Sequence, residues 1–135
     1  RSNGDWPDGK VYIADTLGEL GLFYQLAPVS FIGGSFAPIG GHNPLEPARL
    51  GSAILFGPHQ FNFQEVSDAL RSAGAAEEVE DAAALASAIM ALRKEPRIRQ
   101  TMIEAAARVA AAETAVLDHA LAAVETLIAP SDARP

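Results

Sequence analysis

The sequence contains no cysteine, which excludes disulfide bridges, thiolate metal sites and cysteine nucleophiles. Basic residues are scarce, since 10 lysines and arginines face 17 acidic residues for a formal charge of −7. A general nucleic-acid-binding protein needs the opposite excess, so we expect no nucleic-acid partner. Apolar runs are short as well, and none approaches the roughly 18 residues of a membrane-spanning helix. These absences predict a soluble chain without a disulfide framework.

Apolar sequence is present in the amount that one folded domain needs. Hydrophobic residues make up 49% of the 135 positions, which excludes intrinsic disorder. The chain begins with Arg1 in a polar, turn-rich stretch, from which we expect that it starts inside a longer protein. Residues 130–135 are expected to form a frayed tail.

The distribution of glycine and alanine changes near residue 68. Eight of the 11 glycines lie between Gly18 and Gly57, whereas 21 of the 27 alanines lie between Ala69 and Ala129. Alanine has the highest helix propensity, so the back part favours helices. We therefore predict an α/β part over residues 11–75 and a helical part over residues 76–129.

Short apolar segments alternate with helix starts in the front part. The segments expected to be strands are residues 10–14, 29–32 and 53–56. A helix over 61–73, closed by Gly74, should turn Phe61, Val66 and Leu70 inward. Strands that alternate with helices predict a Rossmann-like parallel sheet with flanking helices.

Two helix starts carry the pattern of a capping box. In the first, Thr16 is the cap and Glu19 reaches back to it, and the helix should end near Leu26. In the second, Asn43 is the cap, Glu46 completes the box, and Pro44 takes the first helical position, where its missing N–H costs nothing.

The alanine-rich part is predicted to hold a helix over 81–94, a break at Pro96, and then one long or two consecutive helices to about Ile128. Four basic residues surround the break: Arg93, Lys94, Arg97 and Arg99. They could form a patch for a phosphate or a lipid headgroup, but positive charge is favourable at any helix C-terminus, so a solvated helix end is the better interpretation.

Ligands of open parallel sheets bind beyond the carboxyl ends of the strands. Two such junctions stand out, residues 14–21 and residues 33–48. Glycines after a strand let a ligand approach the backbone, and the next helix offers unpaired N–H groups, so the second junction suits a phosphate. Glu19 and Glu46 could accept hydrogen bonds from sugar hydroxyls, or they could merely cap their helices.

Familiar signatures of nucleotide and catalytic sites are missing. The chain has no G-x-G-x-x-G turn and no Walker loop, Ser35 lies in no nucleophile elbow, and no spacing supports a zinc or magnesium site. His42 could contact a ligand or anchor the glycine-rich loop. His59 is expected to order a turn, and His119 to be an ordinary helix residue.

Three stretches carry a family resemblance: D-T-L-G-E-L-G-L-F-Y over 15–24, F-I-G-G-S-F-A-P-I-G-G-H-N-P-L-E-P-A over 31–48, and I-L-F-G-P-H-Q-F-N-F over 54–63. Together they strongly resemble the C-terminal domain of 3-deoxy-D-manno-octulosonic acid (Kdo) transferases of Gram-negative bacteria. The resemblance extends from about Val11 to Ile128, and its specificity lies in residues 15–63.

The resemblance implies a two-domain GT-B glycosyltransferase whose C-terminal half binds the donor. Such enzymes move Kdo from CMP-Kdo to a lipid A precursor at the cytoplasmic face of the inner membrane, with inversion and without a required metal or cofactor. The general base, the acceptor surface and the membrane contact belong to the N-terminal domain, which these 135 residues lack. We expect the chain alone to transfer nothing and to bind CMP weakly.

The family's CMP-binding residues map onto two segments of this chain. A Met-Gly-Glu triplet corresponds to Leu17, Gly18 and Glu19, with leucine replacing the commoner methionine, and an Asn-x-x-Glu segment corresponds to Asn43, Pro44, Leu45 and Glu46. Further donor contacts are expected from Gly34, Ser35, Gly41 and His42.

Two other functions stay open at this point. One is the donor domain of another GT-B protein, such as an N-acetylglucosaminyltransferase or a nucleotide-sugar epimerase. The other is a non-catalytic Rossmann-like module that docks through its alanine-rich helices. We also expect apolar surface where the rest of the donor sheet would pack, and hence a homodimer of the isolated chain.

Overall fold

The computed structural model describes residues 11–15 and 17–128. Their elements, in chain order, are α1 (Leu20–Leu26), β1 (Val29–Ile32), α2 (Leu45–Arg49), β2 (Ala53–Phe56), the 3-10 turn η1 (Phe61–Phe63), α3 (Gln64–Ser72), β3 (Ala76–Glu78), α4 (Ala82–Lys94) and α5 (Pro96–Ile128). The predicted α/β class and the predicted strands at 29–32 and 53–56 are confirmed.

The strands of the described residues form one parallel sheet in the order β1-β2-β3. Its central strand β2 is buried at all four positions, which explains its continuous apolar sequence Ala-Ile-Leu-Phe. In β1 only Ser30 and Ile32 are buried. The sheet is thus covered on both faces along its centre and is more open along β1.

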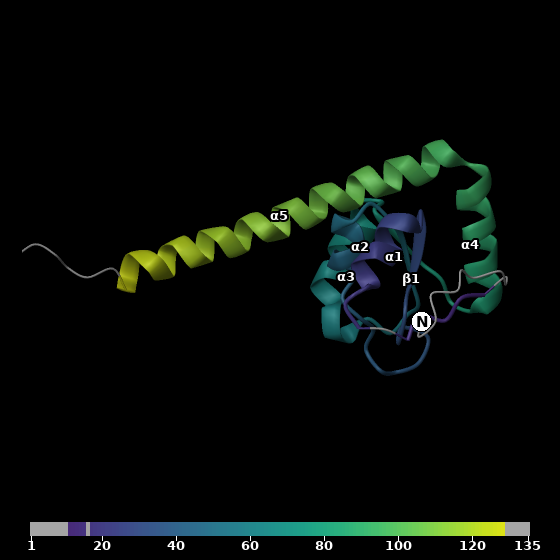
Figure 1. The fold of residues 1–135 in the computed structure, drawn as a ribbon, viewed down its shortest axis with the longest axis horizontal. Coiled ribbons are helices and arrows are strands. Elements are labelled where there is room, and N and C mark those ends of the chain that lie inside the picture. Colours follow the sequence, from purple (N-terminus) through teal and green to yellow (C-terminus); the bar gives the residue numbers. More distant parts are fainter. Residues whose placement is uncertain (1–10, 16, 129–135) are drawn as a thin grey trace, which may run out of the picture.

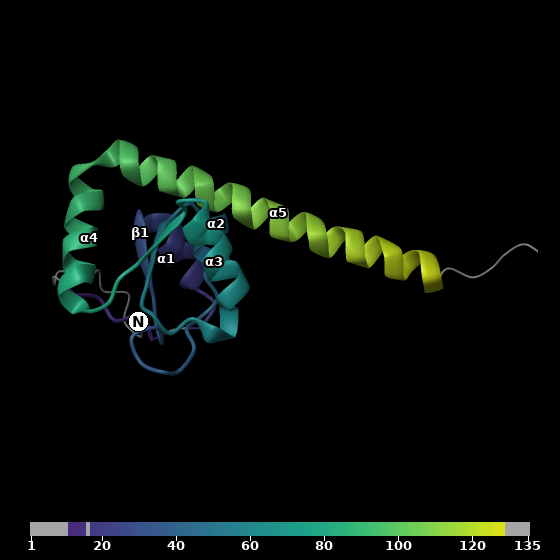
Figure 2. The ribbon, with the colours of Figure 1, turned by 180° about the vertical axis from the view of Figure 1, so that it is seen from behind.

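Helices cover the two faces of the sheet as separate layers (Figures 1 and 2). On one face, Ile54 and Phe56 pack with residues of α2, α3 and α5 such as Ala48, Leu70 and Ala106. On the other face, Leu55 packs with α4 and the start of α5. The alanines of α5 let that helix approach closely, which is their structural use here.

The long helix α5 extends well beyond the rest of the fold (Figure 1). Its first half is packed through Met102, Ala105, Ala106 and Ala110. Its second half carries apolar side chains that are each more than half exposed: Val116, Leu121, Val124 and Ile128. The helix therefore presents an apolar stripe that no other described residue covers.

The predicted first strand is wrong. Residues 11–14 have no regular structure, and Val11 and Ile13 are 81% and 80% exposed. A strand needs a hydrogen-bonding partner and a covered face, and the described residues offer this segment neither. It is instead attached to α1 by the rings of Tyr12 and Phe23, whose centroids lie 5.9 Å apart.

The first helix begins later than predicted. Gly18 has φ +85°, a left-handed conformation that a helix cannot contain, so α1 begins only at Leu20. Glu19 occupies its N-cap position and makes no side-chain cap bond, and Thr16 lies outside the described residues. The predicted end at Leu26 is confirmed.

The predicted helix over 61–73 is corrected at its first turn. Residues 61–63 form η1 rather than α-helix, and Phe61 is 57% exposed instead of inward. The Phe61 ring and the Asn62 side chain pack so closely on Gly40 that a Cβ at this glycine would collide with both. Phe61 therefore covers the glycine loop, while Leu70 is buried as predicted.

The back part differs from the prediction by one strand. The short β3 was not predicted, because Ala-Glu-Glu has little strand propensity and is held by its pairing with β2. Helix α4 is confirmed, with the Asp81 side chain accepting a hydrogen bond from the Ala84 N–H. Of the two arrangements left open after Pro96, the structure has one long helix.

A buried serine joins the carboxyl ends of β1 and β2. Ser35 Oγ donates to the Ile32 carbonyl at 2.5 Å and accepts from the Gly57 N–H at 2.8 Å. The His59 N–H donates to the Ser35 carbonyl at 3.0 Å. This serine junction fixes where the two loops leave the sheet.

Ser35→Ala should lower the free energy of unfolding by about 1–3 kcal/mol, because it leaves the buried Gly57 N–H without a partner. Urea unfolding measures the change. Ser87→Ala is the matched control, since the exposed Ser87 hydroxyl bonds only within its own helix. Equal effects of the two substitutions would contradict the role given to Ser35.

Candidate functional site

A pocket of about 520 Å³ opens at the β1 side of the sheet. Three elements build its wall: helix α1, the strand β1 with the glycine that follows it, and the start of α2. The lining residues are Leu20, Phe23, Tyr24, Ala27, Ser30, Phe31, Gly33, His42, Asn43 and Glu46. The pocket lies along β1 and the segment that follows it, at the second of the two predicted junctions.

The glycine loop after β1 brings the chain back to the strand end. The Gly41 N–H donates to the Gly34 carbonyl at 3.1 Å, and the His42 N–H donates to the Gly33 carbonyl at 3.2 Å. Gly34, Gly40 and Gly41 all have positive φ, which side chains rarely adopt. These bonds place His42 and Asn43 at the pocket and so position the start of α2.

Helix α2 begins one residue later than predicted, with Pro44 rather than Asn43 at its N-cap position. Asn43 Oδ1 still accepts the Leu45 N–H at 2.9 Å, and Pro44 has a helical φ of −81°. Among the described residues, the backbone N–H groups of Asn43 and Glu46 meet no acceptor. Two backbone donors, rather than the whole segment 43–46, are therefore open to a ligand.

Glu46 does not complete the predicted capping box. Its side chain is exposed at the pocket, and its carboxylate accepts no hydrogen bond from any described residue. A glutamate that only capped the helix would reach back to the Asn43 N–H. Of the two roles left open by the sequence, the geometry favours contact with a ligand.

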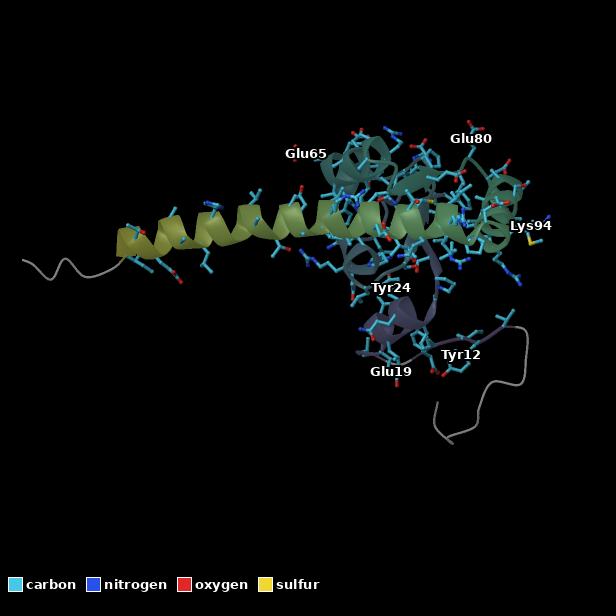
Figure 3. All side chains as sticks on the ribbon, turned by 90° about the horizontal axis from the view of Figure 1, so that it is seen from above. Tyr12, Glu19, Tyr24, Glu65, Glu80 and Lys94 are labelled. Atoms are coloured by element: carbon cyan, nitrogen blue, oxygen red, sulfur yellow. The ribbon has the colours of Figure 1, made fainter. Side chains whose placement is uncertain are left out.

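Tyr24 faces the same pocket from α1. Burial raises the pKa of its hydroxyl above the ordinary value, and the nearby negative charge of Glu46 raises that pKa further. The hydroxyl is therefore protonated at neutral pH and can donate a hydrogen bond. In Figure 3, Tyr24 lies between α1 and the body of the protein, while Glu19 lies at the outer side of α1.

One wall of the pocket is apolar. Leu20, Phe23, Tyr24 and Ala27 occupy one face of α1, because positions three, four and seven residues apart lie on one side of a helix. Phe31 of β1 adds a further ring, packed on Phe36 at a centroid distance of 4.7 Å. The site thus combines a flat apolar wall with polar groups at the start of α2.

The structure brings together three of the predicted site residues, His42, Asn43 and Glu46. Gly41, Pro44 and Leu45 are their chain neighbours. The remaining ones do not line the pocket: Leu17, Gly18, Glu19, Gly34 and Ser35. The Ser35 hydroxyl is buried and already bonded to Ile32 and Gly57.

Tyr24 and the apolar wall were not predicted from the sequence. The spacing of Leu20, Phe23, Tyr24 and Ala27 indicates one helix face, but it does not indicate that this face meets the start of α2 at a pocket.

Neither of the other histidines lies in the pocket. His59 is half-buried in the turn after β2, and its backbone N–H bonds to Ser35 as described. His119 is exposed on α5, with Nδ1 3.2 Å from the Ala115 carbonyl. Within residues 11–15 and 17–128, no three His, Cys, Asp or Glu side chains are grouped as metal ligands, and no helix has the length and apolar character to cross a membrane.

Glu46→Gln should lower the pKa of Tyr24 toward its ordinary value of about 10, because the nearby negative charge is removed while burial remains. Absorbance of the phenolate between pH 8 and 12 measures it in a Tyr12→Phe background, where Tyr24 is the remaining tyrosine. Glu65→Gln on α3, far from Tyr24 in Figure 3, is the control and should leave the titration unchanged. A shift of equal size in both variants would contradict the pairing.

No family model matches the chain, but comparison with individual proteins finds several 3-deoxy-D-manno-octulosonic acid transferases. The chain is 39% identical over 128 residues to the 3-deoxy-D-manno-octulosonic acid transferase of Bordetella pertussis, which covers 93% of the chain and 30% of that relative. It is 37% identical over 94 residues to a probable mitochondrial 3-deoxy-D-manno-octulosonic acid transferase of Arabidopsis thaliana, covering 67% of the chain and 21% of the relative.

A solved structure is similar in both sequence and fold. The C-terminal CMP-Kdo binding domain of WaaA from Acinetobacter baumannii superposes with a TM-score of 0.69 at 38% identity, over 71% of this chain and 50% of that one. The chain spans about a third or less of the length of the transferases it matches. The chain belongs to the Kdo transferase family and corresponds to its C-terminal domain.

Proposed function

We propose that this chain is the donor-binding part of an inverting glycosyltransferase and that its pocket holds the cytidylate part of CMP-Kdo. The observation that carries the proposal is the meeting of Asn43 and Glu46 with the apolar face of α1 in one pocket at the glycine loop. The named ligand of the similar Acinetobacter baumannii domain supports the same donor. The complete protein would transfer Kdo to a lipid A precursor at the cytoplasmic face of the inner membrane.

The groups of the pocket have distinct uses toward a cytidylate. The free N–H groups of Asn43 and Glu46 can bond a phosphate oxygen. The Glu46 carboxylate can accept from ribose hydroxyls or from the cytosine amino group. The flat wall of α1 suits a ring, and His42 is placed to face the Kdo part.

Stabilising the phosphate would also serve the reaction. Negative charge develops on CMP as it leaves, so donors fixed at the phosphate stabilise the transition state more than the ground state. Leu17, Gly18 and Glu19 directly precede Leu20, which lines the pocket, and we propose that they contact the nucleotide from its edge. We propose that the isolated chain transfers nothing, because the general base belongs to the N-terminal domain of such enzymes.

CMP should shift the backbone amide resonances of His42, Asn43, Leu45 and Glu46 in this chain, and UDP should not. Glu46→Ala should weaken CMP binding about ten-fold or more, because it removes a charged acceptor. Glu65→Ala is the control at an exposed carboxylate on α3. A response to UDP would favour another GT-B donor domain, and no response to any nucleotide would favour a non-catalytic module.

We propose, as a separate property, that the isolated chain self-associates through the exposed stripe of α5. Leu121→Glu should convert it to a monomer, because a charge in the stripe opposes burial of its apolar side chains. Sedimentation velocity measures the change. Ala112→Glu, on an exposed part of α5 outside the stripe, is the matched control. A monomeric wild-type chain would contradict the proposal.

A further inference from the structure

Tyr24 and Glu46 reach the pocket from two different helices, α1 and α2. Neither side chain has a hydrogen-bond partner among the residues that the structure describes. The site therefore contains a phenol that can donate and a carboxylate that can only accept, both unused and both facing one space. Groups so arranged are unsatisfied until a ligand or water meets them.

The chemistry of this pair favours a particular kind of ligand group. A carbonyl oxygen can accept from Tyr24 but has nothing to donate to Glu46, and an amino group can bond both only if the phenol accepts instead of donating. A hydroxyl can donate its O–H to the carboxylate while its lone pairs accept from the phenol. An alcohol of a sugar can thus pair with Tyr24 as the donor and with Glu46 as the acceptor.

We propose that Tyr24 is a specificity-determining residue that contacts the ligand and, with Glu46, selects a nucleotide carrying ribose hydroxyls. This inference rests on the proposed function, because it concerns the nucleotide held in the same pocket. It assigns to α1 a role in recognition that its apolar sequence alone would not suggest.

A tyrosine with a purely structural role would donate a hydrogen bond from its hydroxyl to another group of the protein. The Tyr24 hydroxyl has no such acceptor among the described residues, so Tyr24→Phe should leave folding intact. Tyr12 offers a matched control on the same part of the fold. Its ring packs on Phe23 of α1, yet it does not line the pocket.

The test compares CMP with 2′,3′-dideoxy-CMP, which lacks both ribose hydroxyls, by titration of the amide resonances of this chain. Wild type should bind CMP about ten-fold more tightly than the dideoxy nucleotide. Tyr24→Phe should weaken CMP about five-fold and leave the dideoxy nucleotide unchanged, because one neutral hydrogen bond is lost. Tyr12→Phe should change neither affinity.

Two results separate this inference from the proposed function. If Tyr24→Phe weakens neither nucleotide, or both equally, while wild type still binds CMP, the role of Tyr24 is overturned and the CMP site stands. If wild type binds neither nucleotide, the proposed function and the role of Tyr24 are overturned together. Thermal unfolding of both variants confirms that any loss of binding comes from a folded protein.

Discussion

The serine junction is the contact on which the arrangement of the site depends. One buried hydroxyl bonds to the carbonyl of Ile32 and to the N–H of Gly57, and thereby holds the ends of two parallel strands side by side. Gly57 has no room for a side chain, because the Ser35 carbonyl lies where a Cβ would be. The glycine loop starts from this fixed point and returns to it, so the position of α2 follows from a junction that itself touches no ligand.

The start of α2 shows how an acidic chain can still present hydrogen-bond donors to an anion. The chain has a formal charge of −7 and none of the described lysines and arginines lines the pocket, so the proposed phosphate contacts come from fixed local dipoles rather than from basic side chains of this chain. Backbone N–H groups at the start of α2 provide such dipoles, and Glu46 lies there as a hydrogen-bond acceptor.

Much of the fold could be predicted because local and tertiary preferences agree in β1, β2 and α4. Each has an apolar run or period bounded by turn or capping residues. The predictions are wrong where the structure of a segment depends on its contacts with residues far away in the sequence. Residues 11–14 have the composition of a strand, but no strand of the described residues lies beside them with which they could pair. The segment β3 lacks that composition and is a strand because it pairs with β2. Phe61 turns outward to cover Gly40. In the site, polar motif residues were predictable, but Tyr24 was not, because the meeting of α1 with α2 is a tertiary property.

The floor beneath the glycine loop limits how such a pocket can diverge. A methyl group at Gly41 would overlap the amide of Gln60, which is itself 3% exposed and has no hydrogen-bond partner among the described residues. A methyl group at Gly40 would overlap Asn62. Both glycines also have positive φ, so a side chain at either position would strain the backbone as well as displace Gln60 or Asn62. The shape of this loop is thus tied to the turn after β2, so we expect substitutions that reshape the pocket to occur on its α1 wall, at Leu20 or Phe23, rather than in the loop.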